Sequence, residues 1–335
     1  MLATVALQQS RYQLALDSWR RSLELDPRHP RRYLLAVECA ERHRAPWAAQ
    51  AFVDLAPPAI AQMPGFRAGA VLPILVMRDQ MVEAQALVDS LDESALDADG
   101  AVRVIKFLFK TGNDADAAER LGRAIARAQT PEEYSALASL ARNRNLWSQC
   151  AECWQACIAR FPGHEKRFKW QVSLAQALDR TQPVDQAMLN WQALFRRKPA
   201  NMAVLLGYAA CLLKQGDAAE ARLMYQKAVE QGAGRTGLVG LAAATEQMGD
   251  GASALQCWRE AVTMHPDDPD LCRRAVNCAV GLGDHGAAAA LVALVPANVA
   301  ARPEFMAGPL LFFHQSWQQH AAALALLDTL DEDGL

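Results

Sequence analysis

The sequence predicts an all-α repeat solenoid, and three observations point to this fold class. Apolar residues recur at three- and four-residue spacing, which is the period of an amphipathic helix. Helix-ending pairs such as Asp26-Pro27, Phe161-Pro162 and His265-Pro266 fall at regular intervals, and large aromatic residues recur at a period of about 34 residues. With 52% hydrophobic residues, the chain has enough apolar material for units that each pack on their neighbours.

An aromatic column sets the register of the repeats. Trp154, Trp191, Tyr225 and Trp258 lie 37, 34 and 33 residues apart. Small or apolar residues recur at fixed distances from each ring: four before it (Cys150, Ala187, Ala221 and Ala254), three after it (Cys157, Leu194, Ala228 and Ala261), and in the preceding helix (Ala138, Ala175, Ala209 and Ala242). Because small residues let two helices approach closely, each unit is predicted to be a helical hairpin. The ring is expected to fill the space between one hairpin and the next.

This column pattern resembles the tetratricopeptide repeat. Residues 235–266 carry the pattern at repeat positions 4, 7, 8, 15, 20, 24, 27 and 32, with Leu238, Leu241, Ala242, Gly249, Ala254, Trp258, Ala261 and Pro266. Residues 202–232, 131–162 and 168–199 fit it as well, and so does the start of the chain through Ala15, Trp19 and Pro27. The resemblance implies a right-handed superhelical solenoid of about ten hairpins, in which the first helix of each hairpin lines the concave face.

The match to the repeat pattern varies along the chain and suggests three regions. Residues 1–130 hold repeats that are partly divergent, residues 131–267 hold well-matched repeats, and residues 268–335 hold divergent ones. In this register Met1 falls at repeat position 6, and the last hairpin ends at Leu335 without an additional polar helix. Because solenoids usually carry polar caps at both ends, the chain is expected to be a module of a longer protein.

Charge and hydropathy exclude several classes of function. The net charge is −3 and the sequence pI about 6.2, whereas a general nucleic-acid binder needs a strong basic excess. No secretory signal is evident, and the uncharged stretch from His285 to Ala301 is too short and too weakly apolar to span a bilayer. We therefore expect no nucleic-acid partner, no membrane insertion and a cytoplasmic location.

Two motifs invite a chemical interpretation but fit packing better. Gly232, Gly234 and Gly237 match the spacing of a dinucleotide fingerprint, but the segment before them is an amphipathic helix rather than the strand that such a site needs. Cys150, Cys153 and Cys157 share a helical face and could offer three thiolates to zinc, yet two of them occupy small-residue packing positions. The sequence predicts no catalytic residue, no cofactor and no metal, and hence no enzyme.

Basic and polar residues on the first helices are the candidates for partner binding. The positions near the ends of these helices form the predicted groove, and the candidates are Lys106, Lys110, Asn143, Lys169, Arg180 and Lys214. The competing interpretation is that lysine and arginine are favoured at helix C-termini by the helix dipole. The full basic and asparagine clamp, with which chaperone-binding members of the family hold a C-terminal carboxylate, is missing here.

Two functional hypotheses follow. The first is a non-catalytic scaffold or adaptor that binds a protein or peptide segment, acidic in character, in its concave groove. An anionic glycan is the other ligand that would suit a basic groove. The alternative is a targeting or oligomerisation module of a larger enzyme, or of a bacterial cell-surface polysaccharide synthesis system, which would include self-association.

Overall fold

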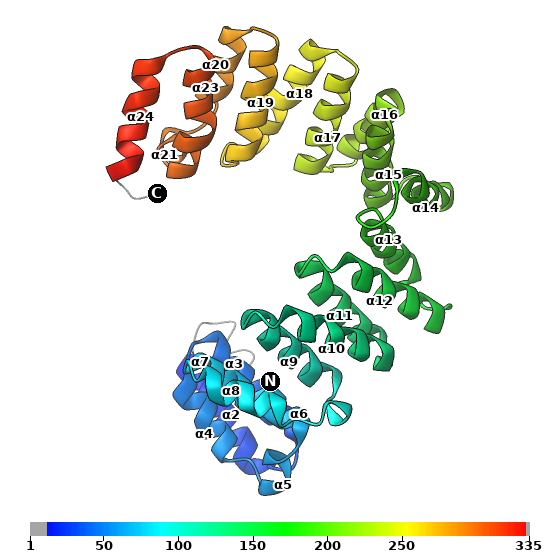
Figure 1. Cartoon of the computed structure of the whole chain (residues 1–335), viewed down its shortest axis with the longest axis vertical. Coiled ribbons are helices and arrows are strands. Elements are labelled where there is room, and N and C mark those ends of the chain that lie inside the picture. Colours follow the sequence, from blue (N-terminus) through cyan, green and yellow to red (C-terminus); the bar gives the residue numbers. More distant parts are fainter. Residues whose placement is uncertain (1–11, 333–335) are drawn as a thin grey trace. The chain divides into compact units, whose positions relative to one another are not determined.

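The computed structural model describes residues 12–332, and the chain divides into two compact units, residues 1–170 and 171–335. The described residues form helices and turns without a strand (Figure 1). Nine complete helical hairpins and the second helix of a tenth follow one another within residues 12–332. The predicted all-α solenoid of about ten hairpins is therefore confirmed. The opening position predicted for Met1 lies outside the described residues, and the three-region division at residues 130 and 267 stays a prediction about sequence regularity.

Unit 1 contains four complete hairpins after α2. Its regular helices are α2 (Tyr12–Leu25), α3 (Pro30–Arg42), α4 (Pro46–Asp54), α8 (Met81–Asp89), α9 (Ala98–Lys110), α10 (Asp114–Arg127), α11 (Pro131–Asn143) and α12 (Trp147–Arg160). One hairpin is irregular, because its first helix is assembled from α6 (Pro64–Phe66), the π-helical turn η1 (Arg67–Val71) and α7 (Leu72–Met77). Short helical turns flank it, namely α5 (Pro58–Ala61) before it and η2 (Glu93–Ala95) after α8.

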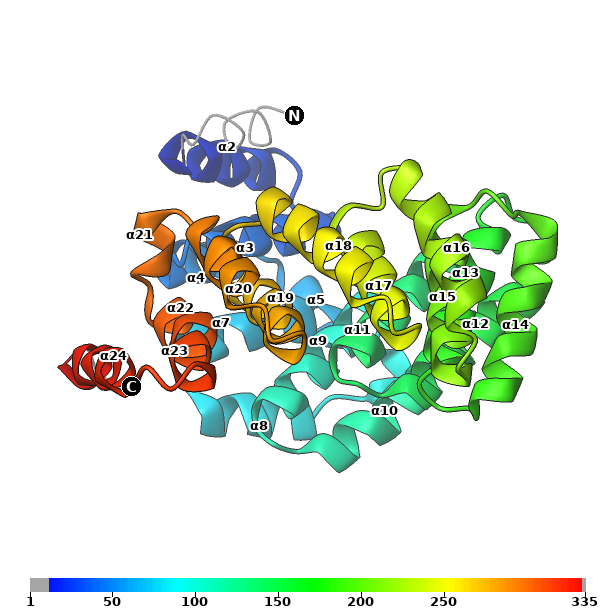
Figure 2. The same cartoon turned by 90° about the horizontal axis from the view of Figure 1, so that it is seen from above.

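Unit 2 continues the array and ends on a hairpin of the same irregular kind. The boundary between the units falls within α13 (Arg167–Leu178). The regular helices that follow are α14 (Val184–Arg197), α15 (Met202–Gln215), α16 (Ala218–Glu230), α17 (Gly234–Gln247), α18 (Gly251–Met264), α19 (Pro269–Gly281) and α20 (His285–Ala293). The remaining elements are α21 (Ala297–Ala300), α22 (Pro303–Phe305), the π-helical turn η3 (Met306–Leu310), α23 (Leu311–Ser316) and α24 (His320–Glu332). Figure 2 shows this series from above.

Local sequence signals start and stop these helices. Proline opens α3, α4, α11 and α19, where its missing N–H costs no hydrogen bond. Thr130 and Glu133 form a reciprocal capping box at α11, which satisfies two otherwise unpaired donors. Most turns within a hairpin contain one residue with a left-handed backbone, as at Gly216 (φ 93°) and Gly249 (φ 80°). Glycine suits these turns because it has no Cβ to clash there.

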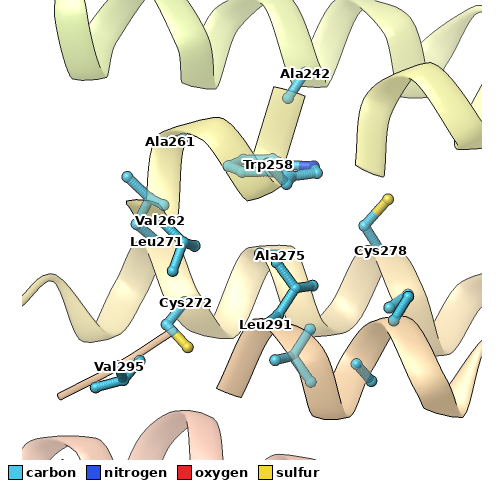
Figure 3. Close-up of a cluster of buried hydrophobic side chains, with 14 of the residues drawn as sticks. Ala242, Trp258, Ala261, Val262, Leu271, Cys272, Ala275, Cys278, Leu291 and Val295 are labelled. Carbon is cyan, nitrogen blue, oxygen red and sulfur yellow. The ribbon is translucent and has the colours of Figure 1, made fainter. Parts of the chain in front are cut away.

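The aromatic column is buried as predicted. Trp191 and Tyr225 each press against a glycine of the next hairpin, Gly207 in α15 and Gly240 in α17. Trp258 is 2% exposed and packs among small residues such as Ala242 and Ala261 (Figure 3). The rings therefore fill the space between hairpins, and no hairpin buries its faces alone.

An internal duplication links the irregular hairpins of the two units. Residues 15–93 align without a gap with residues 254–332, each pair lying 239 residues apart as Pro30 and Pro269 do, and 30 of these 79 pairs are identical. The bounds of seven consecutive elements coincide at this shift, from α2 with α18 through α7 with α23, and these include the two π-helical turns η1 and η3. The irregular hairpins are thus one repeated structure, where the sequence pattern alone suggested only divergence.

Candidate partner-binding site

The first helices of three hairpins form a small pocket in unit 1. Its volume is about 180 Å³, and α3, α7 and α9 line it with Glu41, Leu72, Pro73, Val76, Arg103, Lys106, Phe107 and Lys110. Leu72 and Phe107 are buried and supply an apolar floor. The predicted candidates Lys106 and Lys110 are both exposed at this pocket. The structure therefore brings two of the six predicted residues together.

The pocket has a net positive charge. Arg103 Nη1 donates to Glu41 Oε2 at 3.0 Å, so these two charges largely offset one another. Among the described residues, Lys106 and Lys110 have no ion-pair partner. Two ammonium groups thus remain available beside an apolar floor. The guanidinium of Arg144 lies 4.9 Å from the ring centre of Phe109, a residue of α9 that does not line the pocket.

Arg103 is the basic residue of the pocket that sequence reasoning missed. Arg103, Lys106 and Lys110 are spaced i, i+3 and i+7, which places them on one face of a helix. That signal could have found Arg103.

Four predicted residues lie outside this pocket. Asn143 and Lys169 are exposed in unit 1 and do not line it. In unit 2, Lys214 Nζ donates to Asp179 Oδ2 at 3.0 Å, and Arg180 also has an interaction within the chain. Asp179 accepts a second hydrogen bond from Cys211 Sγ at 3.1 Å. The charge of Lys214 is therefore directed to a carboxylate of its own chain.

The cysteines are buried thiols. All eight are free, and seven of them are buried. Burial raises the pKa of Cys157 and of Cys272 to about 11, and it also raises the pKa of Cys153. No group of three histidine, cysteine or acidic residues within the described part of the chain could hold a metal ion. Since a thiolate is the form that binds metals, raised pKa values favour packing as the role of these side chains.

Stability is expected to fall in alkaline solution because of these thiols. A thiol in the unfolded chain loses its proton near pH 8.5, while Cys157 and Cys272 keep theirs to about pH 11 in the folded state. Between these values the unfolded state binds fewer protons, so the free energy of unfolding decreases as the pH rises. Denaturant unfolding at pH 8, 9 and 10 measures this slope. A C157A/C272A double variant should have a shallower slope, and an equal slope in both proteins would contradict the assignment.

Comparisons with known proteins agree with the repeat architecture. The family profile described as "Tetratricopeptide repeat" matches residues 1–64 and 172–236. Cellulose synthase 1 operon protein C of Komagataeibacter xylinus is 28% identical over 59% of this chain and 15% of its own length. Cellulose synthase operon protein C of Komagataeibacter sucrofermentans is 30% identical over 38% of this chain and 10% of its own length. The chain thus spans a small fraction of the length of these relatives.

Solved structures of similar build include two bacterial proteins. Pseudomonas aeruginosa PilF has a TM-score of 0.47 at 14% identity, covering 60% of this chain and 90% of its own. A tetratricopeptide repeat protein from Parabacteroides merdae has a TM-score of 0.47 at 13% identity, covering 71% of this chain and 93% of its own. No helix within residues 12–332 is long and apolar enough to cross a membrane. The residue columns, the stacked hairpins and the family profile over residues 1–64 and 172–236 agree on a tetratricopeptide-repeat architecture.

Proposed function

We propose that the protein is a non-catalytic scaffold whose unit 1 binds an acidic, partly apolar segment of a partner polypeptide. The pocket between α3, α7 and α9 carries this proposal, because it combines two unpaired ammonium groups with the apolar floor of Leu72 and Phe107. Solenoids of stacked repeats offer extended surfaces of this kind to their partners. The cytoplasm remains the proposed compartment, and nucleic acid is not a proposed partner.

The composition of the pocket favours a peptide over an anionic glycan. A glycan would be held by charge and hydrogen bonds, and it would make no use of the apolar floor that Leu72, Pro73 and Phe107 give the pocket. A peptide in which acidic residues flank a leucine satisfies both parts of the site. The carboxylates would contact Lys106 and Lys110, while the leucine would enter the pocket.

Charge removal at the pocket should weaken this binding. We expect a K106A/K110A double variant to bind a fluorescein-labelled peptide of alternating glutamate and leucine about threefold to thirtyfold more weakly at low salt, since each exposed ion pair contributes up to about 1 kcal/mol. The difference should shrink at 0.5 M salt, where exposed charges are screened. Fluorescence anisotropy measures both affinities, and circular dichroism checks that helicity is unchanged.

A matched control separates local from general charge effects. The K166A/K227A variant removes the same charge from two exposed positions outside the pocket and should bind like the wild type. Equal affinity of all three proteins would disprove the pocket proposal. An alginate oligomer that binds more tightly than the peptide, and loses affinity in K106A/K110A, would replace the peptide with an anionic glycan.

The relatives support a second candidate function. Two proteins of cellulose synthase operons share 28% and 30% identity with parts of this chain. We therefore also propose that the scaffold serves a bacterial system for cell-surface polysaccharide synthesis, as a targeting or oligomerisation module. Deletion of its coding sequence from the host should lower the yield of extracellular polysaccharide. An unchanged yield would count against this candidate and leave the peptide pocket unaffected.

A further inference from the structure

The internal duplication repeats one turn with its charges reversed. This turn joins α2 to α3 in unit 1 and α18 to α19 in unit 2, and the bounds of these helices coincide at the 239-residue shift. Pro27 and Pro30 of the first turn recur as Pro266 and Pro269 of the second. Three charged positions nevertheless change sign between the copies: Arg21 corresponds to Glu260, Arg28 to Asp267 and Arg31 to Asp270.

In unit 1 this turn carries three arginines and one exposed apolar side chain. Leu25, the last residue of α2, is 79% exposed. Arg21 lies one helical turn before it, while Arg28 and Arg31 follow it, and all three are exposed. Within residues 12–332 these three arginines have no ion-pair partner. We call Arg21, Leu25, Arg28 and Arg31 the basic edge.

In unit 2 the same positions form an acidic edge. Met264, the last residue of α18, is 53% exposed. The other members of the acidic edge are exposed carboxylates: Glu260, Asp267 and Asp270. Arg273 and Arg274 follow on α19, and Arg273 approaches the carboxylate of Asp270 at 3.4 Å. Since 74% of the Asp270 side chain remains exposed, this ion pair is weak and leaves the carboxylate accessible.

Neighbouring hairpins do not cover this turn. In unit 2, α17 packs against α18 on one side and α20 packs against α19 on the other. Met264 and Asp267 are exposed with these helices in place. The exposure is therefore a property of the turn itself, and it is the same in both copies.

The helix dipole accounts for the acidic residues but not for the basic ones. Asp270 lies in the first turn of α19, where a negative charge is stabilised by the helix dipole. Arg31 has the same place in α3, where the dipole disfavours a positive charge. Its charge is not offset by an ion pair in the described part of the chain. An acidic partner would offset it.

We propose that the basic edge of one copy binds the acidic edge of a second copy of this chain. Charge complementarity selects this partner, because the two edges have opposite signs at three corresponding positions. Since the two turns have matching helices on both sides, the contact would be nearly two-fold symmetric. Leu25 would then face Met264, and Arg28 would lie opposite Asp270. Two basic edges or two acidic edges would bring like charges together, which disfavours both of those pairings.

This contact joins copies head to tail. The two edges lie on different units of the chain, so each copy that binds through its basic edge still offers an acidic one. Such contacts give a closed ring or an open chain of copies. Exposed ion pairs are individually weak and are screened by salt, so association should need high protein concentration and low salt. The proposal does not depend on the peptide pocket, and it would give an oligomerisation module its physical basis.

Analytical ultracentrifugation of two charge-inverted variants tests the proposal. The variant R21E/R28D/R31D gives unit 1 the residues of unit 2, and E260R/D267R/D270R gives unit 2 those of unit 1. Each new residue already occurs at that position of the other copy, so helicity in circular dichroism should be unchanged. We expect the wild type to associate as its concentration rises, and less so in 0.5 M salt. Each variant alone should associate at least about tenfold more weakly, because its two edges repel.

An equimolar mixture of the two variants is the decisive measurement. One variant then offers only acidic edges and the other only basic edges, so mixing them should restore association at low salt. K166D/K227D inverts two exposed charges outside both edges and should associate like the wild type. A monomeric wild type, a charge-inverted variant that associates as the wild type does, or a mixture that stays monomeric would overturn the proposal. So would loss of association in K166D/K227D, because general charge would then be the cause.

Discussion

Replacement of Trp258 by alanine is expected to lower the free energy of unfolding by about 3–5 kcal/mol. The indole is 2% exposed and lies between hairpins, where Ala242, Ala261 and Ala275 surround it (Figure 3). Its Nε1 donates to Glu246 Oε1 at 2.9 Å. Truncation therefore creates a cavity and removes the donor that pairs with this carboxylate. Chemical denaturation followed by circular dichroism measures the loss.

A second tryptophan provides the control for this prediction. Trp47 is 61% exposed, so W47A should change the free energy of unfolding by no more than about 0.5 kcal/mol. The contrast separates burial from the general effect of removing an indole. A loss below about 1 kcal/mol for W258A would mean that the ring does not fill the space between hairpins and that the repeat register is wrong.

The repeat register could be predicted because several residue columns agree with one another. Trp191, Tyr225 and Trp258 recur together with small residues at fixed distances, and this coincidence identified hairpins whose rings are buried between neighbours. The residues on which these rings pack were not predicted. Gly207 and Gly240 appear in sequence as weak points within a helix, and their role is evident only when the ring of the preceding hairpin is in place.

The irregular hairpins could not be predicted from the repeat pattern alone. The repeat pattern compares each stretch of about 34 residues with one consensus sequence. In that comparison Pro64, Gly69 and Pro73 count only as deviations from the consensus. The long-range alignment shows instead that Pro64 and Gly69 recur as Pro303 and Gly308 at the same places of a second copy. Leu72 and Pro73, at the start of α7, the last piece of this irregular helix, line the pocket with α9.

The candidate site could be predicted only in part, because the spacing along one helix does not show which side chains of different helices meet. Lys106 and Lys110 follow from helical spacing along a single helix, and the structure places both at the pocket. The pairing of Lys214 with Asp179 joins residues on successive hairpins, 35 positions apart. The spacing of residues along one helix shows which face carries a charge, but it does not show which charges on different helices offset one another. Lys214 therefore contributes less to a cationic surface than its position on the helix predicted.

A glycine-to-alanine substitution at position 207 is expected to lower the free energy of unfolding by about 1–3 kcal/mol, although alanine is the better helix former. Gly207 lies within α15, and a Cβ built on it would overlap the indole ring of Trp191. The ring is rigid and 1% exposed, so it cannot move aside without displacing its own neighbours. Overpacking should therefore outweigh the gain in helix propensity. Denaturant unfolding of the wild type and G207A gives the difference.

Gly281 offers the matched comparison in the same unit. It is also a helical glycine, at the end of α19, but nothing lies within 4 Å of a Cβ built on it. G281A should therefore leave stability unchanged or raise it by up to about 1 kcal/mol, because alanine loses less backbone entropy than glycine on folding. If the change in the free energy of unfolding has opposite signs in G207A and G281A, the packing of one hairpin on the next decides which glycines the solenoid requires. A stabilised G207A would mean that Trp191 does not press on α15.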